Sequence, residues 1–306
     1  MPELPDVCVY VEGLEKRLVG HRLLKTRIVS PFVLRSYAPP LSAIEGKALV
    51  GMRRIGKRVV FCFEGELFLV THLMIAGRFR WFEKDEKKLP QKTITLAVLE
   101  FESGTLVLTE ASKKKRASLM LVESEGEVNS LDPGGVDVFE CGLGVFKERL
   151  QKENHTLKRV LTDPRVFSGI GNAYSDEILN AAGLSPIKMS QKLADEEIER
   201  LYETVKEVLE EWLGKLREEF KERFPGAGEI TAFRPDFSVH GKYGKQCGRC
   251  ETEVQRIRYA ETETNYCPRC QTGGKLLADR SLSRILKKDW PKTIEELELK
   301  SRKTEV

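Results

Sequence analysis

Cys247-Gly-Arg-Cys250 and, after sixteen further residues, Cys267-Pro-Arg-Cys270 decide the fold of the C-terminal part of this chain. Each pair presents two thiolates from one tight turn, and two such pairs complete a tetrahedral zinc site. Because four protein ligands leave no open coordination position, we predict one structural Zn²⁺ ion. Two disulfides are the alternative. They are disfavoured because the other three cysteines are isolated and because we expect no secretory signal.

The segment between the two cysteine pairs alternates apolar and polar side chains, with Val254, Ile257 and Tyr259 as apolar positions. This period of two predicts a β-hairpin. We therefore assign residues 241–274 to a zinc finger and residues 275–306 to a charged tail, which we expect to be only partly ordered from residue 288 onward. Finger and tail together carry 15 basic and 10 acidic residues, although the net charge of the whole chain is only +4. This distribution favours a polyanionic partner such as nucleic acid.

The region before the finger has the spacing of helices. Apolar residues recur with a helical period over residues 195–224, which predicts a long helix whose apolar stripe belongs to a core. Before it, Gly169-Ile-Gly171 separates two helical segments, and Asn172 is the expected cap of the second. The N–H groups at such a helix start bind phosphate, although a purely structural pair of helices fits this pattern equally well. We predict a helical domain at residues 145–240.

The N-terminal part has the pattern of an antiparallel sheet. Residues 7–19 predict a helix that stops at Gly20, and a period of two follows over residues 23–122. Two β-hairpins are predicted, at residues 59–73 and 93–108. The predicted N-terminal domain covers residues 1–125, and the turn-rich residues 126–144 are the predicted hinge.

The first three residues, Met1-Pro2-Glu3, have a specific chemical potential. Removal of Met1 turns Pro2 into a secondary amine, and an α-amino group with a pKa of about 8 is partly neutral at physiological pH. Attack of this amine on a sugar or carbonyl carbon gives an iminium ion, which is an electron sink. Glu3 stands beside it as a proton shuttle. Taken alone, the tripeptide is more often an ordinary processed N-terminus.

Composition sets the outer bounds of the fold. A chain of 306 residues with 41% hydrophobic and 32% charged residues predicts a soluble globular protein with two cores and a small finger. No run of eighteen apolar residues occurs, so we expect no membrane span. The isolated cysteines point to a reducing, intracellular compartment, either cytoplasm or nucleoid in a bacterium or the nucleus in a eukaryote.

Five motifs follow one another along the chain: Met1-Pro-Glu-Leu-Pro5, Lys57 after Arg53-Arg-Ile-Gly, His72-Leu73 with Gly77, Gly169-Ile-Gly171-Asn172, and the four cysteines. In this order they resemble the formamidopyrimidine-DNA glycosylase / endonuclease VIII family of base-excision repair enzymes, over roughly residues 1–270. The resemblance implies an α+β multidomain fold. Its parts are an N-terminal antiparallel β-sandwich with flanking helices, a helix–two-turn–helix domain and a C-terminal finger with four cysteine ligands.

The resemblance also implies a function. The implied enzyme flips a damaged base out of double-stranded DNA, and we expect that base to be oxidised. It acts as both glycosylase and abasic-site lyase. The implied catalytic residues are Pro2 as nucleophile, Glu3 as proton carrier and Lys57 as a cation at the anomeric centre. Without the resemblance, Lys57 is better explained as a solvated member of a basic cluster. The implied DNA contacts are His72, Ile75, Lys115, Arg116, Lys158 and Asn172.

The chain departs from the family pattern in three places. Thr262 stands five residues before the third zinc cysteine, where an Arg is usual, so we expect β-elimination to dominate over δ-elimination. Lys115 and Arg116 occupy the places of an Arg-Phe pair, and the basic run at residues 113–116 favours phosphate contact over a solvated turn. Met74-Ile75 replaces Gly-Met, so Ile75 takes the role of filling the void left by the flipped base.

Three functions therefore compete. The leading one is a bifunctional DNA glycosylase and abasic-site lyase, which we expect to be a monomer. The second is a family member that keeps only the lyase activity. The third is a non-catalytic zinc-finger DNA-binding protein, which Pro2, Glu3 and Lys57 disfavour because binding alone needs no N-terminal proline. The sequence does not distinguish an oxidised purine from an oxidised pyrimidine as the lesion.

Overall fold

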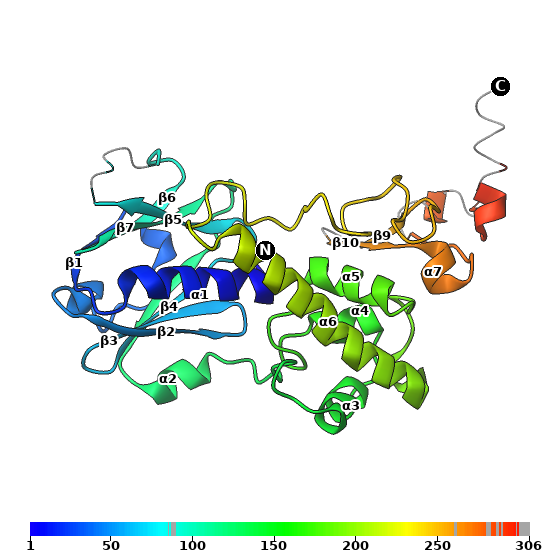
Figure 1. Cartoon of the computed structure of the whole chain (residues 1–306), viewed down its shortest axis with the longest axis horizontal. Coiled ribbons are helices and arrows are strands. Elements are labelled where there is room, and N and C mark those ends of the chain that lie inside the picture. The colour runs from blue at the N-terminus through cyan, green and yellow to red at the C-terminus, as the bar shows by residue number, and fades with distance from the viewer. Residues whose placement is uncertain are drawn as a thin grey trace. The chain divides into compact units, whose positions relative to one another are not determined.

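A computed structural model describes residues 1–84, 86, 90–259, 262–279, 283–285, 288, 290–297 and 299. The chain divides into two compact units (Figure 1). The first unit comprises Met1–Gly135 and Glu210–Ala232, and the second comprises Val136–Leu209 and Phe233–Val306. The five-part segmentation predicted from the sequence is finer than this division and stays a prediction. Within the described residues, no helix has both the length and the apolar character needed to cross a membrane.

The first unit is built on two antiparallel sheets of four strands each. One sheet has the order β1 (Leu23–Ile28), β6 (Thr95–Phe101), β7 (Gly104–Glu110) and β5 (Gly77–Glu83). The other has the order β2 (Leu49–Ile55), β3 (Arg58–Phe63), β4 (Leu67–His72) and β8 (Ser118–Val122). Aromatic rings join the sheets, because Phe61 packs on Phe79 and Phe63 on Phe101 with centroids 5.8 and 6.5 Å apart. This arrangement confirms the predicted β-sandwich and both predicted hairpins.

Helix α1 (Leu4–Leu18) packs against β2 and β3 and starts three residues earlier than predicted (Figure 1). The backbone N–H of Glu3 donates to the Asp6 carboxylate at 2.9 Å, which satisfies one of the free groups at the helix start. Pro5 is tolerated there because the first turn of a helix needs no N–H donor. Because α1 begins at Leu4, the tripeptide Met1–Glu3 lies directly at its N-terminal end.

The predicted hinge contains a helix, α2 (Glu125–Ser130), in addition to turns. Its cap is Ser124, whose hydroxyl accepts the Glu127 N–H at 3.2 Å. Short 3₁₀ segments lie at Pro31–Val33, Leu41–Ile44 and Ser190–Lys192.

The second unit contains the helices α3 (Leu143–Gln151), α4 (Leu157–Thr162) and α5 (Asn172–Ala181). The long helix α6 (Asp195–Glu219) contributes to both units and ends five residues before the predicted end. Beyond the end of the helix, Phe224 packs on Tyr10 of α1, with ring centroids 5.6 Å apart.

The finger consists of β9 (Gln255–Tyr259), β10 (Thr262–Tyr266) and the short helix α7 (Pro268–Thr272), and β9 and β10 form the predicted antiparallel hairpin. It packs on α5, where Asn180 donates to Gln271 at 3.1 Å. The described part of the tail bonds to itself, with Leu276 N–H to Lys292 O at 2.8 Å, and to the end of the finger, with Ile294 N–H to Gly274 O at 3.0 Å. Much of the remaining tail, including residues 300–306, lies outside the described residues.

Candidate functional site

The amino terminus of the first unit lies in a buried environment. Pro2 and Glu3 are both buried, and Glu3 is only 2% exposed. Met1 precedes Pro2 here, so the Pro2 nitrogen is an amide and the free amine belongs to Met1. Burial lowers the pKa of the Met1 amine, and the cations of Arg78 and Lys57 also lower it, against the opposing effect of Glu3. The environment of the chain start therefore favours a neutral amine.

Lys57 lies in the tight turn between β2 and β3. Gly56 before it has a φ of 56°, a left-handed conformation that glycine adopts without steric cost. The charge of Lys57 acts on both the terminal amine and His72. The structure thus brings together the terminal amine, Glu3, Lys57 and His72 within one unit.

His72 ends β4, paired with Arg58 on β3 and Ser118 on β8. Its Nδ1 accepts the backbone N–H of Met74 at 3.0 Å. Burial, with the nearby charges of Arg58 and Lys57, lowers the pKa of His72 to about 4. The imidazole is therefore neutral at physiological pH. Because Nδ1 is an acceptor, the ring proton is on Nε2, and the free side of the ring is a hydrogen-bond donor.

Ile75 lies in the turn between β4 and β5, and its side chain is 58% exposed. Met74 before it has a φ of 53°, which is uncommon for a residue with a side chain. Gly77 closes the turn with an N–H bond of 2.8 Å to Leu73 O, and a Cβ on Gly77 would lie 2.2 Å from that oxygen. A glycine is therefore required, and the turn presents an apolar side chain to solvent.

Lys115 and Arg116 are held by Glu110, a buried carboxylate at the end of β7. Glu110 accepts the backbone N–H groups of Arg116 at 2.8 Å and Ala117 at 3.0 Å, and Lys115 Nζ donates to the Glu110 carbonyl oxygen. Glu110 also pairs with Gly77 across the sheet, so this segment adjoins the turn of Ile75. The sequence reasoning missed Glu110, because only the strand pairing reveals it. The Arg116 side chain is exposed and available for an external contact.

In the second unit, Asn172 is the first residue of α5, and the capping position belongs to Gly171. The prediction that Asn172 caps this helix is therefore wrong. Its side-chain amide instead donates to the backbone oxygen of Glu263 on β10 at 2.9 Å. Gly171 occupies the flanking position with an extended backbone. Asn172 thus joins α5 to the finger.

Lys158 forms a mostly buried ion pair with Asp176 of α5, at 2.5 Å, and also donates to the Asn172 backbone oxygen at 2.6 Å. Asp176 further binds His240 at 2.7 Å and the Asn265 N–H at 3.1 Å. The sequence reasoning missed Asp176. The Lys158 ammonium therefore already has strong internal partners, which link α4, α5 and the finger.

Glu177, next to Asp176, was also missed. Its carboxylate accepts the backbone N–H groups of Ser238, Val239 and His240 at 2.7 to 2.9 Å. Burial raises the pKa of Glu177 despite these bonds. The pair of acidic residues therefore organises the chain that leads into the finger.

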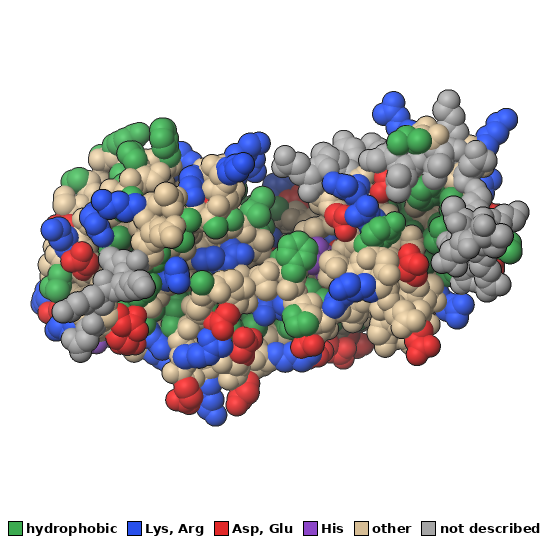
Figure 2. Space-filling model, turned by 90° about the horizontal axis from the view of Figure 1, so that it is seen from above, with side chains coloured by type: hydrophobic (Ala, Val, Ile, Leu, Met, Phe, Trp, Pro, Cys, Tyr) green, Lys and Arg blue, Asp and Glu red, His purple; other side chains and the backbone are tan. Residues whose placement is uncertain are grey.

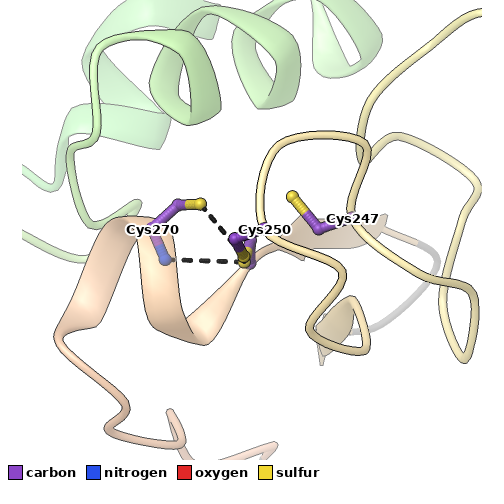
Figure 3. A group of neighbouring side chains, drawn as sticks. Cys247, Cys250 and Cys270 are labelled. Atoms are coloured by element: carbon purple, nitrogen blue, oxygen red, sulfur yellow. Dashed lines mark hydrogen bonds between the residues drawn. The ribbon is translucent and has the colours of Figure 1, made fainter.

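The four finger cysteines form one cluster, with all sulfur atoms within 4.8 Å of one another. Cys250 Sγ lies 3.4 Å from the sulfur atoms of both Cys267 and Cys270. Figure 3 draws Cys250 and Cys270 with a dashed line between them, and Cys247 beside them. Zn–S bonds of about 2.3 Å in a tetrahedron separate the sulfur atoms by about 3.8 Å, so the observed spacing fits a metal site. A disulfide needs about 2.05 Å, and all four cysteines are free.

Thr262 begins β10 and pairs with Tyr259, whereas Glu263 pairs with Arg258. Successive side chains of a strand point to opposite faces, so Arg258 lies on the face opposite to Thr262. Arg256 shares the face of Arg258. It pairs with Glu263 at 3.1 Å and covers the ring of Tyr243 at 4.0 Å. Neither arginine takes the position of Thr262.

Basic side chains occur at the surface among hydrophobic and acidic ones on the face drawn in Figure 2.

A family model described as the formamidopyrimidine-DNA glycosylase N-terminal domain matches residues 1–116, and the H2TH domain model of the same enzyme matches residues 137–219. Formamidopyrimidine-DNA glycosylase of Heliobacterium modesticaldum is 30% identical over 277 residues, which cover 89% of this chain and 100% of the relative. This chain belongs to the formamidopyrimidine-DNA glycosylase family. The predicted family and helix–two-turn–helix domain are thereby confirmed.

Solved structures of the family agree. A mutant Lactococcus lactis Fpg in complex with Fapy-dG-containing DNA has a TM-score of 0.77 and 25% identity, covering 89% of this chain and 100% of that one. Lactococcus lactis Fpg non-covalently bound to DNA with an abasic site has a TM-score of 0.75 and 25% identity, with 88% and 99% covered. The class of enzyme is therefore the predicted one, a DNA-repair glycosylase of a family in which abasic-site lyase activity is typical.

Proposed function

We propose that the protein removes an oxidised base from double-stranded DNA by attack of the Pro2 amine and then cleaves the strand by β-elimination. The observation that carries this proposal is the buried chain start, where Pro2, Glu3 and the charge of Lys57 meet at the N-terminal end of α1. Such a constellation has no use in a protein that only binds DNA.

The first step is displacement at the anomeric carbon of the flipped nucleotide. The lone pair of the Pro2 nitrogen forms a bond to C1′, and the bond from C1′ to the base breaks with its electron pair on the base. A neutral amine is required for this attack. The burial of Pro2 supports the step, because a buried environment disfavours the charged form of an amine.

Glu3 and Lys57 assist at the sugar. Glu3 is buried beside Pro2 and moves a proton to or from the ring oxygen as the sugar opens. Lys57 is a cation in a rigid turn, and it stabilises negative charge that develops on the sugar and the adjoining phosphate.

After the displacement, the Pro2 nitrogen loses its proton. Its lone pair then forms the C1′=N bond as the C1′–O4′ bond breaks with its electron pair on the ring oxygen, which takes up a proton. Strand cleavage follows from the resulting iminium ion. The positively charged nitrogen acidifies the C2′ proton, a base removes that proton, and its electron pair forms a C2′–C3′ double bond. The C3′–O bond then breaks, and the 3′-phosphate leaves with the electrons. Hydrolysis of the iminium releases an unsaturated aldehyde on the upstream strand and the free amine.

DNA contacts come from both units. His72 offers its Nε2–H to a phosphate, Arg116 provides an exposed cation, and Ile75 fills the void left by the flipped base. Lys115 and Lys158 contribute positive charge, although each ammonium group also has a partner inside the protein. These partners are the Glu110 carbonyl oxygen for Lys115 and the Asp176 carboxylate for Lys158. These contacts fix the register of the enzyme without reading sequence.

The finger is the structural anchor of the DNA contact. Cys247, Cys250, Cys267 and Cys270 would hold one Zn²⁺ ion, which supplies cross-linking of the two turns and no catalytic chemistry. The hairpin then keeps the backbone oxygen of Glu263 within hydrogen-bond distance of the Asn172 side chain. Asn172 is the residue that binds a DNA phosphate in this proposal. We propose that the protein works as a monomer in an intracellular compartment that contains DNA.

A panel of duplexes tests this function. One strand carries an oxidised purine, a formamidopyrimidine, an oxidised pyrimidine, an abasic site or no lesion. We expect release of at least one oxidised base and cleavage at the abasic site. Cleavage of abasic DNA without release of any base leaves only the lyase activity, and binding without cleavage leaves only a DNA-binding protein.

Gel analysis of the cleaved strand should show mainly the β-elimination product. The second elimination needs a cation or acid near the far phosphate oxygen, and the Thr262 hydroxyl lacks an arginine's charge and fork of donors. We expect Thr262→Arg to increase the δ-product, whereas Thr264→Arg serves as the matched control on the same face of the hairpin. A dominant δ-product that survives Arg256→Ala and Arg258→Ala contradicts this prediction.

NMR titration should give His72 a pKa of about 4, compared with the ordinary value of 6.5. Since the folded state depresses this pKa, His72 contributes stability that is present above pH 6.5 and is lost as the pH falls toward about 4. The chain has four histidines, so His72→Asn identifies the resonance. A midpoint near 6.5 for that resonance would contradict the buried, neutral imidazole.

A further inference from the structure

Arg78, at the start of β5, joins two segments of the first unit by hydrogen bonds to carbonyl oxygens. Its Nη1 donates to Ile75 O at 3.1 Å and to Gly77 O at 2.7 Å, both in the turn that presents Ile75. Its Nε donates to Ile230 O at 2.6 Å, 152 residues further along the chain. One guanidinium therefore ties this turn to the segment that follows α6.

The turn has little freedom of its own. Gly77 has no space for a Cβ, and Met74 is in the left-handed region. The Arg78 bonds satisfy two carbonyl oxygens next to the exposed Ile75, groups that would otherwise depend on water. The Arg78 guanidinium thus binds the backbone at Ile75 itself and two residues after it.

The segment after α6 is anchored on the other side. Phe224 packs on Tyr10 and lies under the Arg17 guanidinium. Glu229 pairs with Arg223 at 2.5 Å and accepts the Gly226 N–H at the same distance. Ile230, whose oxygen Arg78 binds, is only 1% exposed. Arg78 therefore connects the turn to a fixed point of the fold.

We propose that Arg78 is a positioning residue for base excision: it holds the Ile75 turn against the Ile230 segment, so that Ile75 enters the duplex in a fixed orientation. This inference rests on the proposed function, in which Ile75 fills the void of the flipped base. A lysine cannot replace Arg78, because a single ammonium on a flexible stem lacks the planar fork that reaches three oxygens.

Arg78 has a second effect, through charge. Its cation is the larger of the two cationic contributions that lower the pKa of the terminal amine, after burial itself. We expect the same cation to act on the Pro2 amine of the processed chain, so its loss should raise the pKa of that amine and move trapping toward higher pH. Geometry and charge are therefore separable, because Arg78→Lys keeps the charge and loses the fork, whereas Arg78→Met loses both.

The experiment uses the full, zinc-loaded chain with Met1 removed. Single-turnover base excision and the fluorescence of 2-aminopurine opposite the lesion are measured for wild type, Arg78→Lys and Arg78→Met. We expect both variants to lose at least about tenfold in excision rate, since a misplacement of about 1 Å can cost 10²-fold. Both should also lose most of the fluorescence change that reports insertion of Ile75. The pH midpoint of borohydride trapping should rise only in Arg78→Met.

Arg80→Met is the matched control, because Arg80 lies on the same strand and contacts Phe82 through its guanidinium. Thermal unfolding of each variant shows whether it is folded, and Ile75→Ala gives the fluorescence expected for a lost insertion in an intact fold. Wild-type fluorescence and excision in Arg78→Met would overturn the role of Arg78 while base excision stands. A wild-type chain that neither excises nor traps would instead overturn the proposed function.

Discussion

A chain that keeps one residue in front of Pro2 is expected to form no covalent adduct with abasic DNA in borohydride. The processed chain, which starts at Pro2, should form the adduct readily. The physical reason is that an amide nitrogen shares its lone pair with the carbonyl, whereas a terminal proline nitrogen is a free secondary amine. Loss of a nucleophile commonly costs several orders of magnitude, so we expect a fall of about 10³-fold or more in the trapping rate.

The comparison is sharp because both samples share every residue from Pro2 onward. One sample starts at Pro2 after removal of Met1, and the other retains a single residue before it, as mass spectrometry of the intact chain would verify. Pro2→Gly keeps an amine but replaces the secondary amine by a primary one, so trapping should be much slower. Normal trapping by the blocked chain would show that another group, such as a lysine, is the nucleophile.

Replacement of a finger cysteine should have the second large effect. We expect one zinc ion per wild-type chain, and we expect Cys250→Ser to lose that ion together with at least about tenfold in affinity for abasic DNA. The finger folds through its metal, so its hairpin loses order when one ligand is removed. Asn172 and Asp176 then lose their contacts with Glu263 and Asn265 on β10. Metal analysis and a binding titration at fixed salt measure both effects.

Cys141→Ser is the matched control, because Cys141 lies outside the cluster and the substitution is the same. It should keep both zinc and DNA affinity. All four finger cysteines belong to the second unit, so we expect the sandwich core of the first unit to unfold at a similar temperature in Cys250→Ser. A disulfide between finger cysteines, or full DNA affinity after loss of the metal, would contradict the assignment.

Local patterns predicted the local elements of the fold. The hairpins β3–β4 and β6–β7 were predictable because a period of two flanks a short glycine-containing turn. The pairings β1–β6 and β4–β8 were not, since they join strands that are far apart in the chain and carry no mutual signal. Helix α2 was missed although Ser124 and Glu127 match the capping-box pattern, because the neighbouring glycines and proline suggested only turns.

The site divides in the same way. Cysteine spacing alone predicted the cluster, because metal ligands impose a fixed pattern on the sequence. The partners of Lys158 and Arg116 were unpredictable, because Asp176 and Glu110 reach them only after helices or strands have packed. A buried carboxylate beside a predicted DNA contact is a property of tertiary structure. The sequence therefore named the candidate cations but not the groups that hold them.

The first unit is built from two stretches of the chain, residues 1–135 and 210–232, and this limits the order in which it can fold during synthesis. Glu12 pairs with Arg217, 205 residues later, and the Tyr10 ring packs on Phe224. At about 5–20 residues per second, the ribosome needs roughly 5–20 s to make the stretch from residue 135 to residue 232. During that interval α1 exposes part of the surface that these later residues will cover. The first unit therefore cannot complete its packing until residues 210–232 have been synthesised.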